Sequence, residues 1–67
     1  MTKAQSEANE VLAVAALKTA QQAIVEGNFW LAKSYLKTAI KFANKAGRKA
    51  MACRAMAALQ CVTLANA

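Results

Sequence analysis

The chain has 67 residues, is 58% hydrophobic and carries nine basic against three acidic side chains, which gives a net charge of +6. A chain of this length forms one small domain, residues 1–67, and domains near this size commonly need a disulfide, a metal or oligomerisation to be stable. The sequence contains no histidine, and two cysteines without histidine cannot complete a four-ligand zinc site. We therefore expect no metal, no cofactor, and oligomerisation as the source of additional burial.

The first predicted element is a helix over residues 6–26. Alanine, the strongest helix former, is frequent and proline is absent. Thr2 with Gln5, or Ser6 with Glu10, provides an N-terminal cap. The larger apolar residues spread over more than half of the circumference, so this helix is expected to be contacted on more than one side.

A short connection follows the first helix. Gly27 is a typical C-terminal glycine, and Asn28 is a typical N-cap for the next helix. Because the connection is short, we expect an antiparallel helical hairpin. The second helix is predicted over residues 29–46 and ends before Gly47.

The second helix is strongly amphipathic. At about 100° per residue its apolar side chains fall in one continuous arc. The opposite arc contains four lysines at i, i+4 spacing: Lys33, Lys37, Lys41 and Lys45. Neighbouring lysines at this spacing repel by on the order of a few tenths of a kcal/mol, and no acid in the segment offsets them. We interpret the row as a binding site for a negatively charged partner, which Arg48 and Lys49 extend past the turn; the alternative is a face that only solvates the helix.

Trp30 projects into the lysine arc beside Lys33 and Lys37. An exposed tryptophan among cations is typical of a stacking platform for bases or of an interface anchor. The alternative is a tryptophan that folds back over the Gly27 turn and seals the core, as a hydrophobic staple does.

The third helix is predicted over residues 48–65 and completes an all-α, compact three-helix bundle: an antiparallel hairpin with a third helix packed on it. Apolar residues nearly encircle this helix, so one side is predicted to bind a second copy through Met51, Met56, Leu59 and Val62. The alternative is that small residues such as alanine expose too little apolar surface to need a partner. Cys53 and Cys61 lie about 12 Å apart along the axis and cannot bridge each other. Free thiols and the absence of a signal-like or membrane-spanning apolar run favour a cytoplasmic protein.

The hairpin resembles the second half of a tetratricopeptide repeat. The residues that carry the resemblance follow the repeat's spacing: Gly27, Phe29, Ala32, Leu36, Ala39 and Ile40, with Ala20 at the small position of the first helix. It covers about one repeat, residues 13–46, and departs from the repeat at Ala16 and Ala23, where bulky residues are usual, and at Asn44, where proline is usual. The three-helix microtubule-interacting-and-transport domains share a similar pattern. Both resemblances imply a helical hairpin used for protein binding.

Three functions are compatible with these features. The first, which we favour, is a non-enzymatic cationic interaction module, a regulator or inhibitor that docks its lysine face on an acidic protein surface. The second is a nucleic-acid binder that uses phosphate contacts and stacking on Trp30. The third is a cationic membrane-active peptide of the bacteriocin kind. Catalysis is not expected, because neither cysteine has a histidine to activate it.

Overall fold

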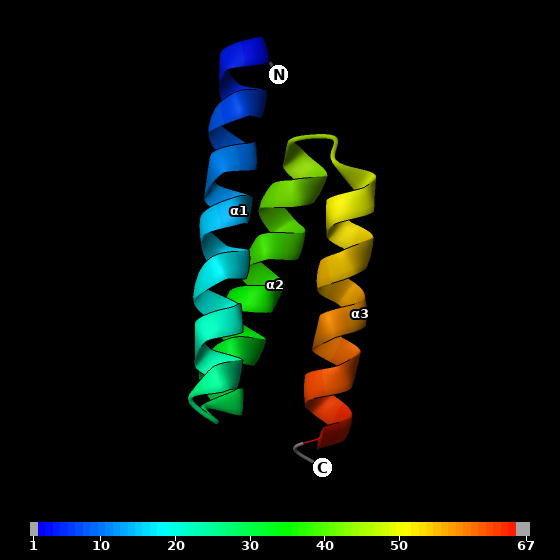
Figure 1. The fold of residues 1–67 in the computed structure, drawn as a ribbon. Coiled ribbons are helices and arrows are strands. Elements are labelled where there is room, and N and C mark those ends of the chain that lie inside the picture. The colour runs from blue at the N-terminus through cyan, green and yellow to red at the C-terminus, as the bar shows by residue number, and fades with distance from the viewer. Residues whose placement is uncertain (1, 66–67) are drawn as a thin grey trace.

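The computed structural model describes residues 2–65 as an all-α, three-helix bundle. Its helices are α1 (Lys3–Val25), α2 (Phe29–Lys45) and α3 (Lys49–Ala65). The middle helix α2 packs against both α1 and α3, and consecutive helices run in opposite directions (Figure 1). The principal extents of 39 × 17 × 13 Å describe a long, flat array. The predicted fold class is confirmed.

The N-terminus of α1 lies three residues earlier than predicted, because the first of the two proposed caps forms. The Thr2 hydroxyl accepts from the Gln5 N–H at 3.2 Å, and the Gln5 side-chain oxygen accepts from the Thr2 N–H at 2.9 Å. This reciprocal pair is a capping box. Ser6, the alternative cap, instead donates its hydroxyl to the Ala46 carbonyl at 3.0 Å, which joins α1 to the end of α2.

Both turns close in the same way. Gly27 and Gly47 have φ values of 78° and 73°, a left-handed conformation that glycine adopts without steric cost. After the first, the Asn28 N–H donates to the Ala23 carbonyl at 2.8 Å, and the Arg48 N–H makes the equivalent bond in the second turn at 2.9 Å. These are the bonds of Schellman motifs, and they produce the two antiparallel connections.

Alanine lines most of the core. Within residues 2–65, ten of the twelve buried apolar residues are alanines, and the other two are Leu36 and Val62. Small side chains let the helices approach closely, but each buries little apolar area, and the free energy of burial scales with that area. The helices therefore pack closely, but burial of this core contributes little free energy of folding.

The expectation that α1 is contacted on more than one side is wrong. The buried residues of α1 form a single stripe that faces the bundle: Ala13, Ala16, Ala20 and Ala23. Val11 and Val25, which belong to the apolar spread of this helix, are 67% and 82% exposed. The alanine stripe, with the half-buried Leu17 and Ile24 packed beside it, forms the buried face of α1.

Candidate functional site

The outward face of α2 carries the lysine row. The opposite face of this helix is buried in the bundle through Ala32, Leu36, Ala39 and Ala43. Because α1 and α3 both pack on that buried side, the lysines are left at the surface. Lys37 and Lys41 are exposed, whereas Lys33 is half-buried. Lys45 is exposed and places its Nζ 5.7 Å from the centroid of the Phe42 ring, within the range of a cation–π contact.

The charges are segregated along the chain. All three acids lie before Gly27, at Glu7, Glu10 and Glu26, and only two of the nine cations precede it, Lys3 and Lys18. Seven cations and no acid therefore follow Gly27. Within residues 2–65 the ion pair joins Arg48 to Glu10, so no acid in the described chain neutralises the lysine row.

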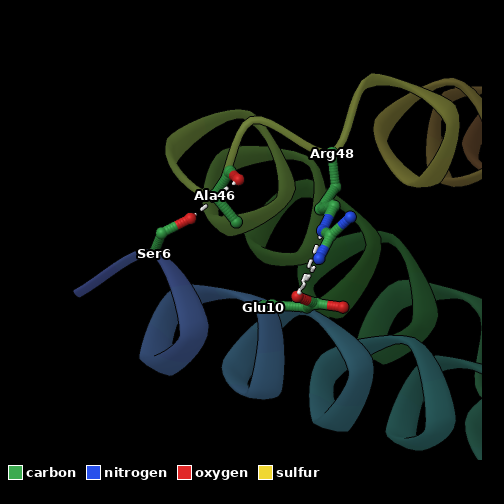
Figure 2. A network of polar contacts seen from close by, with 4 residues as sticks. All are labelled: Ser6, Glu10, Ala46 and Arg48. Atoms are coloured by element: carbon green, nitrogen blue, oxygen red, sulfur yellow. Dashed lines mark hydrogen bonds and ion pairs between the residues drawn. The ribbon is translucent and has the colours of Figure 1, made fainter. Parts of the chain in front are cut away.

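Arg48 forms an ion pair within the chain. Its Nε and Nη2 donate to the Glu10 carboxylate at 3.1 and 2.9 Å, and Figure 2 shows this pair beside the hydrogen bond from Ser6 to Ala46. Both contacts connect α1 with the turn between α2 and α3. The carboxylate of Glu10 therefore offsets the charge of Arg48 at the end of the cationic row, while the Arg48 side chain remains 58% exposed. Lys49, the first residue of α3, remains exposed.

Trp30 lies on the lysine face and points to solvent. It is 75% exposed, which contradicts the alternative in which it seals the core. Around the helix it falls between Lys37 and Lys41. With Ser34 these residues follow i, i+4, i+7 and i+11 spacing, and all four are exposed. We call this set, Trp30, Ser34, Lys37 and Lys41, the outer stripe.

The exposure of Trp30 has a spectroscopic consequence. We expect the fluorescence maximum of the free protein, which contains one tryptophan, to lie near that of free indole, because a ring this exposed is surrounded by water. Acrylamide should quench it about as efficiently as it quenches free tryptophan. A blue-shifted and protected emission would show that the ring packs against the bundle.

The residues predicted to bind a second copy lie mostly on the inward side of α3. Val62 is 4% exposed and belongs to the core cluster around Leu36, so it is not available to a partner, which corrects its assignment. Met51 and Leu59 are half-buried against the two core clusters. Met56 is 48% exposed. The opposite side, which contains Cys53, Ala57, Cys61 and Leu64, faces solvent.

Both cysteines are free and exposed, and on one helix they lie too far apart to bridge each other. In the part of the chain that the structure describes, no three residues of the metal-binding types come together. Over the same residues, no helix combines the length and the apolar character needed to cross a membrane.

Comparisons with protein-family models, with curated proteins and with solved structures found no match.

Proposed function

We propose that this protein is a non-enzymatic interaction module that docks the lysine face of α2 on an acidic protein surface and thereby regulates or inhibits a larger assembly. The observation that supports the proposal most is the outer stripe, in which exposed lysines flank an exposed tryptophan and no acid of residues 2–65 pairs with them. The likeness to a tetratricopeptide hairpin supports the same class of function, since such hairpins bind proteins.

The area and the core of the bundle also support a binding partner. The protein exposes 4545 Å², whereas a globular protein of 7.1 kDa is expected to expose roughly 4,100 Å². Among residues 2–65 the largest side chain of the core is that of Leu36. A partner that covers part of this surface would add to the burial that an alanine-lined core supplies only weakly, because binding to the folded state stabilises it.

Nucleic acid is the second candidate, and the exposure of Trp30 favours it, because an exposed aromatic ring among cations can stack on a base. The face itself contains lysine alone. Arginine, the residue whose fork matches a phosphate with two parallel hydrogen bonds, occurs at Arg48, which is paired with Glu10, and at Arg54 on α3. Lysine binds phosphates and carboxylates alike as a point charge, so digestion with nuclease is the experiment that separates the two partners.

A membrane-active peptide has less support. Such peptides insert the apolar face of an amphipathic helix into the lipid interface. The apolar arc of α2 is used within the bundle, where Ala32, Leu36 and Ala39 are buried. Insertion of α2 would require the bundle to open.

Capture from a cell lysate treated with nuclease tests the proposal. We expect the immobilised protein to retain an acidic protein after DNA and RNA have been digested, and salt to release it, because the contacts are exposed ion pairs. If nuclease removes everything that the protein retains, the partner is a nucleic acid and the proposal is wrong.

Self-association through α3 is a separate proposal. Because Val62 is buried, self-association would depend on Met56 and on the exposed apolar residues of the outward side of α3, among them Leu64 at 77% exposure. Sedimentation over a range of concentrations tests it. A monomer at every concentration excludes it.

A further inference from the structure

We infer that the element which docks on α2 is itself an α-helix, one that carries carboxylates at i, i+4 spacing and crosses α2 over the centre of the outer stripe. This inference rests on the proposed function and specifies its partner. It starts from two parallel rows of side chains on the exposed face. One is the lysine row, from Lys33 to Lys45. The other begins with the exposed Trp30, Ser34 and Thr38 and ends at Phe42, which is half-buried against the core.

Both rows are i±4n ridges of the helix. Successive side chains in such a ridge are about 6 Å apart along the axis, at 1.5 Å per residue, and the ridge is inclined by about 26° to it. When two helices pack through their i±4n ridges, at a crossing angle near −50°, the ridges of both run in the same direction. Glutamates on an i±4n ridge of the partner therefore have the spacing and the inclination of the lysines, and each carboxylate can lie beside an ammonium group.

The second ridge provides room for that approach. Its middle positions are the small residues Ser34 and Thr38, and both are exposed. The Thr38 hydroxyl donates to the Ser34 carbonyl at 3.1 Å, so it is already satisfied by its own helix. The centre of the face is thus a low strip of small side chains, with Trp30 at one end and the lysine ridge along one side.

The exposure of the four lysines identifies the centre of the contact. Helices that cross at about 50° diverge quickly, so they touch over about two turns. Lys37 and Lys41 are exposed and lie in the middle of the ridge, whereas Lys33 is half-buried and Lys45 lies against the ring of Phe42. The central pair should therefore contribute most of the attraction. Trp30, seven residues or about 10 Å before Lys37 along the axis, should lie at the edge of the contact, where its fluorescence can report binding.

Synthetic peptides test this inference directly. Two alanine-based helical peptides would have the same length, composition and net charge, with four glutamates either on one i, i+4 ridge or distributed around the helix. Binding would be followed through the fluorescence of Trp30 and through anisotropy of a labelled peptide, at physiological salt. We expect the ridge peptide to bind about tenfold more tightly, because alignment of charge, and not its amount, differs between the two.

Variants of the protein define the contact further. Replacing both central lysines (Lys37→Glu, Lys41→Glu) should remove the preference for the ridge peptide. It should also create binding to a peptide with lysines in place of the four glutamates. The matched change at the ends of the row (Lys33→Glu, Lys45→Glu) has the same charge and should weaken ridge-peptide binding less. Circular dichroism checks that every variant keeps its helicity.

The outcomes separate this inference from the proposed function. Equal affinity for the two peptides, or an equal effect of central and terminal substitutions, overturns the helical partner and leaves an acidic protein surface in place. Failure of both peptides to bind, together with salt-sensitive binding of a single-stranded oligonucleotide, overturns both.

Discussion

Replacement of Leu36 by alanine is expected to remove a large part of the stability of this protein. Leu36 is 2% exposed and is the one leucine among the buried residues, which are otherwise alanines and Val62. Truncation of a buried leucine costs about 2–5 kcal/mol, and a domain of 67 residues holds roughly 3–10 kcal/mol in total. Unfolding by urea, followed by far-UV circular dichroism, should show a much lower midpoint or a chain that is already unfolded.

Leu64→Ala is the matched control, because it removes the same atoms from a side chain that is 77% exposed. Its effect should stay within about 0.5 kcal/mol, as is usual for surface substitutions away from special features. Similar losses for the two substitutions would mean that Leu64 is buried in solution, and that the packing of α3 differs from the one described.

The helices and their ends were predictable because their signals are local. Gly27 and Gly47 occur where the chain needs a left-handed residue, and Asn28 caps the helix that follows, accepting from the Leu31 N–H at 3.2 Å. Each of these contacts spans only a few residues. The helix boundaries in the structure therefore differ from the predicted ones by at most one residue, except at the start of α1, where the difference is three residues.

The buried faces of α1 and α3 were not predictable, because alanine gives no clear period. An alanine costs little whether it is buried or exposed, so the few larger apolar residues dominated the pattern. In α1 they suggested contacts on several sides, and Val11 and Val25 are exposed; in α3 they suggested a free face that includes Val62, which is buried. The alanine stripes are buried because small side chains let the helices approach closely, and the sequence of one helix does not show this.

The lysine face was predictable from the sequence, since α2 has large apolar residues on one arc and cations on the other. Two features at its edge, the ion pair of Arg48 and the exposure of Trp30, depend on contacts between distant parts of the chain. Arg48 and Glu10 are 38 residues apart in the sequence, and the exposure of Trp30 depends on how the end of α1 packs. Neither has a local signal.

Reversing three charges of the row should abolish partner binding while the helices remain. Lys33→Glu, Lys37→Glu and Lys41→Glu together change the net charge by −2 at each site, from +6 to zero. Each glutamate would face a carboxylate of the partner, and like charges in contact cost several kcal/mol at an interface. We expect the affinity for the captured partner to fall by on the order of a hundredfold or more, because the change replaces attraction with repulsion at three positions.

The control for this experiment has the same net charge with the face intact. Lys3→Glu, Lys18→Glu and Arg54→Glu also bring the charge to zero, at exposed positions of α1 and α3. A general attraction between a cationic protein and an anionic partner depends on net charge, so both triple variants would then lose binding equally. If the lysine face docks on the partner, the affinity depends on the positions of the charges, so the control variant should keep most of its affinity. Its association rate should fall, because long-range electrostatic steering follows the total charge. Equal losses would therefore exclude α2 as the docking face, whatever the partner is.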